Sequence, residues 1–498
     1  MAMIPTMRPA TGTTSASVDP RVVWLTLAAF IVAFARGVPH LFEPFGEGWA
    51  SVLDTRFAGN FIRNWDRYGF FALGGRPLHA FSPVYDIAAD GYVGHPPTVY
   101  WLTYGLTRLF GVSEWSIRLL PTLFAAGSAA LTALLVGRRA GLAAGTAAAL
   151  LVTVDEMHYV FGSMASCESP VLFFMLLAWV CRDADRPKLT AAAAFAAVLC
   201  DWSGAFLLPA LLIYERATPR SDRRYRPIVA AAIGVGTALA LILGLLAFWK
   251  GGLGSALSAL WRAANDNDAM GATERADWPA SQVRMFVDGH GKAFAIAAAG
   301  AVVLAIALMR RSDLARLAVA LIVPGALNVL LFPARAYDHD YWWFYATPGA
   351  AAAIALAVHL IRKQTTVIVS CSTAAAIVVA AAVNLGSAII ETPAATAPET
   401  IAAVNRVYDR RTIVLFPDPT PAISYYAVPW IHPLPTSAAD LERLVANFRS
   451  GAMPIDRVVA YVPPWLDAGA KESAVRALEK KGGVSRNIGT TDVIEFAR

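Results

Sequence analysis

Residues 189–214 read LTAAAAFAAVLC, then DWSG, then AFLLPALLIY, and the path of this stretch decides the topology of the whole chain. A helix needs about 20 apolar residues to cross a bilayer, so the stretch is long enough for a single span. It is also compatible with two short helices that reverse direction at Asp201. The charges of the flanking loops separate these two alternatives.

Basic residues in the loops favour the hairpin. Short cytoplasmic loops of membrane proteins collect Lys and Arg. With a reversal at Asp201, all basic loops fall on one side of the membrane: Arg138 with Arg139, Arg182 to Lys188, residues 217–226, Arg310 to Arg316, and Arg362 with Lys363. A single span would move the loops after residue 214 to the opposite side. We therefore expect a hairpin.

Further apolar segments supply the other helices. They lie at 21–41, 117–137, 141–157, 167–182, 227–249, 291–309, 313–332, 342–360 and 365–386. Together with the hairpin they predict a polytopic α-helical membrane protein with about eleven transmembrane helices. The composition agrees, because 57% of the 498 residues are hydrophobic and 16% are charged, whereas soluble domains carry about 25% charged residues.

The first apolar segment predicts how the chain is inserted. Residues 1–20 are polar and typical of a disordered tail. The apolar run after Arg21 is about as long as a span and lacks a small-residue cleavage site, which favours a retained signal anchor. We expect the N-terminus to lie in the cytoplasm.

This topology gathers polar residues on the outer face. The transmembrane region is expected to cover 21–388, with a long first outer loop at 42–116. Within that loop, residues 54–68 repeat aromatic side chains at helical spacing beside basic ones, and residues 95–111 are short and aromatic and contain Arg108. Both segments predict helices that lie at the interface. Further outer segments are expected as a tight turn at 158–166, a polar loop at 250–290 and a turn at 333–341.

The last part of the chain has a different pattern. Strands are expected at 412–416, 456–462 and 492–497, alternating with helices at 437–451 and 468–481. Residues 391–498 therefore predict a small α/β domain outside the cytoplasm. It has no Gly-rich phosphate loop, which favours an accessory or docking role over a catalytic one.

Two residues of the first outer loop are candidates for chemistry. Asp54 opens the segment 54–68, where a carboxylate fits a helix N-cap and a catalytic acid or base equally well. His95 precedes Pro96, where it either caps the interfacial helix or binds a phosphate. The residues alone leave both pairs of alternatives open.

Helix ends further along the chain offer more candidates. Glu168 begins an apolar helix, where an ionisable group is usually functional or paired. Asp155, Glu156 and His158 are expected to be solvated at a helix end. Asp201 belongs either to the site or to a solvated turn. The four cysteines show no CxxC or Cys/His metal spacing, which predicts apolar packing residues.

The turn FPARAYDHDYWW lies between two apolar helices, and its polar residues are Arg335, Tyr337, Asp338, His339 and Asp340. Such a cluster either lines a site or caps two helices, and we favour the site. Arg335 suits a phosphate, and His339 suits a phosphate or a sugar hydroxyl. A metal bound by His339 has little support, because no second histidine stands at ligand spacing.

Several motifs occur in an order known from one protein family. Asp54, Arg63, Asn64 and Gly69 are followed by GHPPTVYWL, LFGVSEWSIRLLP, GRRAG and HYVFGSMASCESPVLFF. In this order they resemble the membrane glycosyltransferases of the GT-C fold, and within them the branch of protein O-mannosyltransferases and the lipid A aminoarabinose transferase. The resemblance covers roughly residues 20–215 by motif, and the rest only by helix number and a terminal outer domain.

The resemblance implies a hexosyl or pentosyl transferase of the bacterial inner membrane. It would take a sugar from a polyprenyl-phosphate carrier and pass it to a lipid, glycan or protein acceptor on the outer face. Asp54 matches the family's acidic residue of the first outer loop, the candidate general base. Many relatives have Glu after this residue, whereas this chain has Thr55.

Other positions match the family less directly. His95 occupies the place where relatives often have Lys or His, and it is expected to bind the donor phosphate together with Arg335 and His339. Glu168 matches the acidic residue of the second outer turn. It is expected to orient the sugar or the acceptor, as are the residues Tyr337 and Asp340.

No cofactor follows from the sequence with certainty, and a divalent metal stays an open alternative. Membrane lipids are expected partners, and nucleic acid is not. The main alternative function is a transporter or flippase of lipid-linked sugars. A transporter would show repeats and charged, broken helices at the bilayer midplane, whereas the charges of this chain gather outside the membrane, which favours an enzyme.

Overall fold

The computed structural model describes residues 19–45, 54–78, 92–219, 225–265, 272–364 and 396–407, and the strands at 412–416, 430–433, 457–462, 484–488 and 491–497. The chain divides into two units. The first comprises Met1–Glu43, Val93–Leu102 and Arg118–Ile389, and the second comprises Pro44–Tyr92, Thr103–Ile117 and Ile390–Arg498. Each unit is described by itself.

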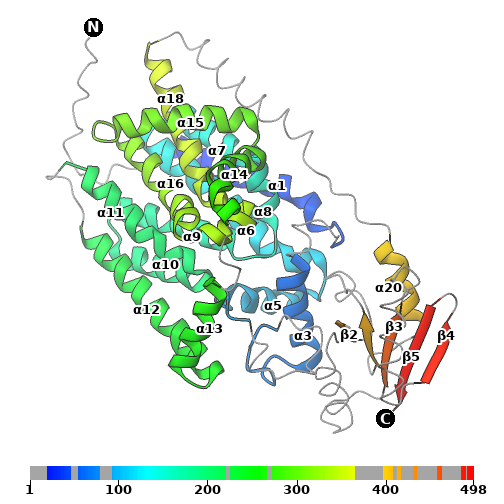
Figure 1. The fold of residues 1–498 in the computed structure, drawn as a ribbon. Coiled ribbons are helices and arrows are strands. Elements are labelled where there is room, and N and C mark those ends of the chain that lie inside the picture. The colour runs from blue at the N-terminus through cyan, green and yellow to red at the C-terminus, as the bar shows by residue number, and fades with distance from the viewer. Residues whose placement is uncertain are drawn as a thin grey trace. The chain divides into compact units, whose positions relative to one another are not determined.

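Long apolar helices dominate the first unit (Figure 1). Within the described residues, five helical segments are long and apolar enough to cross a membrane: Pro20–Leu41 (α1), Glu114–Ala140 (α6), Tyr225–Lys250 (α12), Asp313–Leu331 (α16) and Tyr341–Ile361, which includes most of α18 (Thr347–Gln364). The protein is therefore a polytopic helical membrane protein.

Two bent helix pairs raise this number to seven if each pair is one span. Glu156–Ser163 (α8) meets Glu168–Asp183 (α9) at 110°, and Arg275–His290 meets Lys292–Leu308 (α15) at 116°. Shorter apolar helices are Leu142–Val154 (α7) and Pro187–Cys200 (α10). The expected segment 365–386 lies outside the described residues, and the total of about eleven spans stays a prediction.

The stretch 189–214 is broken at Asp201, as the loop charges predicted. Helix α10 ends at Cys200, a 3-10 turn covers Trp202–Phe206 (η2), and Leu207–Ala217 forms α11. Asp201 accepts a hydrogen bond from the backbone N–H of Ser203 at 2.9 Å, which caps the new turn. Glu215, near the end of α11, contacts Arg182, shortly before the start of α10. The two helices therefore run in opposite directions.

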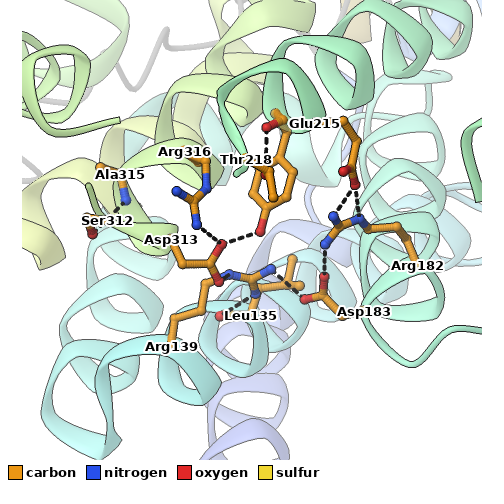
Figure 2. Close-up of polar contacts among 11 residues, drawn as sticks. Leu135, Arg139, Arg182, Asp183, Glu215, Thr218, Ser312, Asp313, Ala315 and Arg316 are labelled. Carbon is orange, nitrogen blue, oxygen red and sulfur yellow. Dashed lines mark hydrogen bonds and ion pairs between the residues drawn. The ribbon is translucent and has the colours of Figure 1, made fainter. Parts of the chain in front are cut away.

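Charged side chains join four helix ends at one end of the first unit (Figure 2). Arg182 of α9 donates from Nε to Glu215 of α11 at 3.0 Å and from a terminal nitrogen to Asp183 at 2.9 Å. Arg139 of α6 lies 2.6 Å from Asp183 and 3.0 Å from Asp313 of α16. We call these five residues the ion network. They lie at helix ends in or beside the basic segments that the charge rule assigns to one side of the membrane, in agreement with the hairpin.

Small residues allow the helices to approach closely. A Cβ added at Gly234 of α12 would lie 2.2 Å from the carbonyl oxygen of Ala191 in α10. A Cβ at Gly145 of α7 would lie 2.9 Å from the Cα of Gly137 in α6. Membrane helices associate through such packing, because lipid chains provide no hydrophobic drive between them. Figure 1 shows α10 and α12 side by side.

Three outer segments contain more helix than predicted. The expected loop at 250–290 contains Leu253–Asn265 (α13) and Ala272–His290 (α14). The expected tight turn at 158–166 is largely occupied by α8, which begins directly after Asp155 ends α7. The 333–341 segment contains a short helix at Pro333–Asp338 (α17) and the start of a 3-10 helix at Asp340–Ala346 (η4).

The second unit contains the aromatic helix expected at 54–68. Thr55–Gly59 forms a π-helical turn (η1), and Asn60–Tyr68 forms α3. Phe61 and Trp65 are fully buried, and Trp65 Nε1 donates to the carbonyl of Arg76 at 2.8 Å. The apolar face of this helix is therefore buried inside the unit. The predicted helix at 95–111 is also present, as Thr98–Phe110 (α5).

The C-terminal part of the second unit holds a five-stranded sheet of order β2-β1-β3-β5-β4. Thr412–Phe416 (β1) is parallel to Trp430–Pro433 (β2) and to Arg457–Val462 (β3). Thr491–Ala497 (β5) is antiparallel to β3 and to Val484–Ile488 (β4). The three expected strands are confirmed, while β2 and β4 were not predicted. The helices expected at 437–451 and 468–481 lie outside the described residues.

Candidate functional site

An ion pair between His95 and Asp201 forms the centre of the candidate site. His95 lies in the loop before α5, and Asp201 lies at the break after α10. His95 Nδ1 is 2.5 Å from Asp201 Oδ2. Trp202 Nε1 donates to the carbonyl of Gly94 at 2.8 Å, which fastens the two loops together. Asp201 is buried, so the alternative of a solvated turn is wrong.

The pair stabilises its own charges. Burial alone would lower the pKa of His95, but the adjacent Asp201 carboxylate raises it above its ordinary value. Burial raises the pKa of Asp201, but His95 and the hydrogen bonds from Ser203 lower it below its ordinary value. Opposite charges at this distance favour the charged form of both groups. His95 therefore keeps its positive charge over a wider pH range than a solvated histidine.

Cys167 and Glu168 lie beside this pair. The Cys167 sulfur is 3.6 Å from His95 Nδ1. Glu168, the first residue of α9, is buried and interacts electrostatically with both His95 and Asp201. Its Oε2 makes no hydrogen bond to the described part of the chain. The prediction that Cys167 only fills apolar space is wrong, because its thiol lies within a polar cluster.

Arg335 and His339 belong to the same cluster, since both interact electrostatically with His95. His339 Nδ1 lies 2.8 Å from the carbonyl oxygen of Arg335. A carbonyl only accepts hydrogen bonds, so Nδ1 carries the hydrogen. Burial lowers the pKa of His339 to about 4. The ring is therefore neutral at physiological pH, and its Nε2 is an acceptor, which suits a hydroxyl better than a phosphate.

The cluster lies at the end of the first unit opposite the ion network. Helix α9 begins at Glu168 in the cluster and contains Arg182 in its last turn, roughly 20 Å further along the helix axis. Helix α16 connects the same two ends, because it begins at Asp313 and its Asn328 accepts a hydrogen bond from Ser203 at 3.0 Å. The ion network and the His95 cluster therefore lie at opposite ends of α9 and α16.

The remaining predicted site residues lie in α17, at the start of η4 and in the second unit. Tyr337 lies in α17 and is partly buried. The side chain of Asp340 lies outside the description. Asp54 belongs to the second unit, where it begins the helical segment 54–68 and is fully buried.

A second buried network surrounds Asp155. Its carboxylate accepts hydrogen bonds from His290 Nδ1 at 2.7 Å and from the backbone N–H of His158 at 2.8 Å, and the Thr347 hydroxyl lies at 3.4 Å. The prediction that Asp155 and His158 are solvated is wrong, because α14 and α18 cover this helix end. The sequence signal was weak: each of these polar residues stands at a helix break, but nothing in the sequence pairs them.

The family and structural comparisons agree with this architecture. Residues 72–184 match the family described as dolichyl-phosphate-mannose-protein mannosyltransferase. The matched region contains His95, Cys167 and Glu168. Among curated proteins, none matches the sequence at a significant level.

Two solved structures share the fold over most of this chain. ArnT from Cupriavidus metallidurans, bound to undecaprenyl phosphate, is 13% identical, and the match covers 95% of this chain and 97% of that chain with a TM-score of 0.59. The oligosaccharyltransferase AglB from Archaeoglobus fulgidus, in complex with an inhibitory peptide and a dolichol-phosphate, is 12% identical, covering 88% of this chain and 69% of that chain with a TM-score of 0.51. The chain has the GT-C fold of membrane glycosyltransferases.

Proposed function

We propose that the protein transfers a sugar from a polyprenyl-phosphate donor to an acceptor of the cell envelope. The observation that carries this proposal is the meeting of His95, Asp201, Glu168, Arg335 and His339 at one end of the helical unit. Sugar transfer from a lipid carrier requires polar chemistry at the membrane surface, where the phosphate of the carrier lies. The family match over residues 72–184 supports the same chemistry.

His95 and Arg335 are proposed to bind the donor phosphate. When the bond between the sugar and the phosphate breaks, the phosphate gains negative charge, and fixed cations lower the energy of that transition state. The Asp201 carboxylate holds the imidazolium of His95 in place before the donor arrives. The guanidinium of Arg335 provides planar, charge-assisted hydrogen bonds to phosphate oxygens.

The acceptor side is proposed to involve His339 and Glu168, with Tyr337 and Asp340 on the same turn as His339. The neutral His339 offers Nε2 as an acceptor for a hydroxyl of the sugar or of the acceptor. The buried Oε2 of Glu168 has an unused lone pair for the same purpose.

Asp54 is proposed as the general base, on the strength of the motif resemblance. The acceptor hydroxyl attacks the anomeric carbon as Asp54 takes its proton. The bond from that carbon to the phosphate oxygen breaks, and polyprenyl phosphate leaves. A base must come within hydrogen-bond reach of the attacking hydroxyl to act in this step.

The proposal also assigns an orientation. We place the ion network on the cytoplasmic side, because the basic loops gather there, and the His95 cluster on the outer side of a bacterial inner membrane. Residues 1–20 would then form a cytoplasmic tail. Residues 391–498 would form an outer domain of accessory function.

Binding of undecaprenyl phosphate to the purified protein in nanodiscs tests the donor site, with native mass spectrometry as the measurement. We expect Arg335→Gln to weaken binding about tenfold, since a charge-assisted hydrogen bond contributes about 1.5–3 kcal/mol. Arg284→Gln is the matched control, because Arg284 pairs with Asp277 at an exposed site. Equal binding by Arg335→Gln and the wild type would refute the assignment of Arg335.

A flippase gives a different result. It would move undecaprenyl phosphate or its sugar derivative across liposome membranes without an acceptor and without releasing sugar. Such movement, without sugar transfer, would replace the proposed enzyme by the transporter alternative.

A further inference from the structure

Three side chains of types that bind metals converge at the centre of the cluster. His95 Nδ1, the Cys167 sulfur and an Asp201 carboxylate oxygen all lie within 4.8 Å of one another. In a tetrahedral zinc site, with Zn–S near 2.3 Å and Zn–N or Zn–O near 2.1 Å, neighbouring ligand atoms lie about 3.4–3.6 Å apart. The Nδ1 to sulfur distance of 3.6 Å fits this spacing.

The His95 and Asp201 atoms are closer, at 2.5 Å, because they share a proton. A cation that replaces this proton would separate the two atoms by about 1 Å, to the ligand spacing of a tetrahedral site. His95 lies in a loop and keeps 27% of its side chain exposed, so a movement of this size requires no change in a helix.

Glu168 provides an independent indication of a cation. It follows Cys167 directly, only 3% of it is exposed, and its Oε2 has no hydrogen-bond partner in the described part of the chain. A buried carboxylate oxygen without a partner is costly, and such groups are usually paired or coordinate a metal. Its carboxylate interacts electrostatically with His95 and Asp201, so it lies near the three converging side chains.

We propose that His95, Cys167, Asp201 and Glu168 bind a divalent transition-metal ion of the zinc class. The thiolate and the imidazole select such an ion over Mg²⁺ and Ca²⁺, which prefer oxygen ligands. Binding releases the thiol proton of Cys167 and the proton shared by His95 and Asp201. Arg335, which interacts electrostatically with His95, offsets part of the remaining negative charge.

Metal binding does not depend on the proposed function, and it keeps the phosphate contact proposed for His95. With the ion on Nδ1, the other ring nitrogen of His95 keeps its N–H, as it does in the protonated ring. His95 can therefore donate a hydrogen bond to an anion in both states. With the metal bound, the positive charge at His95 comes from the ion. Without the metal, it comes from the proton on the ring.

Cobalt titration of the full-length protein in detergent, under reducing conditions and without chelator, tests the site. We expect one equivalent of Co²⁺ to produce a thiolate-to-cobalt charge-transfer band in the near ultraviolet and the visible bands of tetrahedral cobalt. Zn²⁺ should displace the cobalt and remove both. Absence of the charge-transfer band in the wild-type protein would overturn the proposal.

Cysteine variants identify the ligand. Cys167→Ser should abolish the charge-transfer band. Cys181→Ser should retain it, because Cys181 is also buried and free but lies towards the other end of α9. A band that survives in Cys167→Ser would overturn the proposal as well.

A second variant guards against misfolding. His95→Gln changes a loop residue and should weaken Co²⁺ binding at least about tenfold while gel filtration still shows a single folded species. Because the variant removes one member of the buried pair with Asp201, its melting temperature without metal should fall. Unchanged Co²⁺ affinity in the folded variant would contradict the assignment. Undecaprenyl phosphate binding, measured on the same samples, reports on the proposed function separately. Failure of the wild type to bind Co²⁺ would overturn the metal site alone, and its failure to bind undecaprenyl phosphate would count against the proposed function alone.

Discussion

Replacing Glu215 by Gln removes one negative charge from the ion network while it keeps the size of the side chain (Figure 2). In the wild type, the side chains of Arg182 and Glu215 are 6% and 1% exposed, and two nitrogens of Arg182 donate to Glu215 Oε1. The guanidinium also lies over the Tyr214 ring, 4.3 Å from its centroid. The substitution leaves this buried cation with Asp183 as its remaining anionic partner within the described residues.

The size of the effect follows from burial. Removing one partner of a buried ion pair destabilises a protein by about 3–5 kcal/mol, because the other charge stays buried without compensation. Asp183 and the Gln oxygen still accept hydrogen bonds from Arg182, so we expect the lower end, about 3 kcal/mol. Replacing both members, in Arg182→Met with Glu215→Leu, should cost less than Glu215→Gln alone, because no uncompensated charge remains.

Equilibrium unfolding by SDS in mixed micelles, followed by tryptophan fluorescence, measures these free energies. The matched control is Asp277→Asn in the pair of Arg284 and Asp277, whose side chains are 64% and 44% exposed. An exposed pair contributes about 0–1 kcal/mol, so this variant should unfold almost like the wild type. If Glu215→Gln costs no more than Asp277→Asn, the ion network does not hold these helix ends together.

Three further predictions concern packing, the Asp155 network and pH. Gly234→Ala should destabilise the protein by about 1–3 kcal/mol through overpacking, whereas Gly236→Ala on the same helix has no atom within 4 Å of the new Cβ and should be neutral in the same unfolding assay. Asp155→Asn should lower the melting temperature in detergent, because the charged acceptor of His290 and His158 is lost at a cost of about 1.5–3 kcal/mol; Glu156→Gln, at the adjacent and less buried position, should change it little. The pKa of His339 is lowered to about 4 in the folded protein, so the unfolded chain binds the proton first as the pH falls; stability should therefore decrease from about pH 6.5 to 4 by about 3 kcal/mol. His339→Gln should lose this part of the pH dependence, and an unchanged profile would contradict the assignment of a neutral ring.

The helices were predictable because apolar length and loop charge are local properties of the sequence. The break at Asp201 followed from the distribution of Arg and Lys, and the structure explains it by the cap on Ser203. The strand β1 was predictable from its short apolar run. The strand β2 was not, because WIHP is brief and contains a proline.

The contacts of the candidate site could be predicted only in part. Motif order singled out His95 and Glu168, but the pairing of His95 with Asp201 joins residues 106 positions apart. Cys167 was expected to be a packing residue because it begins an apolar segment, whereas its neighbours in space include the charged side chains of His95 and Asp201. Asp155 was misjudged because its burial depends on α14 and α18, which follow much later in the chain.

The central claim is sugar transfer from a polyprenyl-phosphate donor. Incubation of the purified protein in nanodiscs with undecaprenyl phosphate carrying a radiolabelled sugar and with envelope extract as the acceptor tests it most directly. We predict that the wild type moves label into the acceptor fraction and releases undecaprenyl phosphate, while a folded Asp54→Asn variant does neither. Full transfer by that variant would remove Asp54 from the mechanism, and no transfer by the wild type with a panel of hexose and pentose donors would contradict the proposed function.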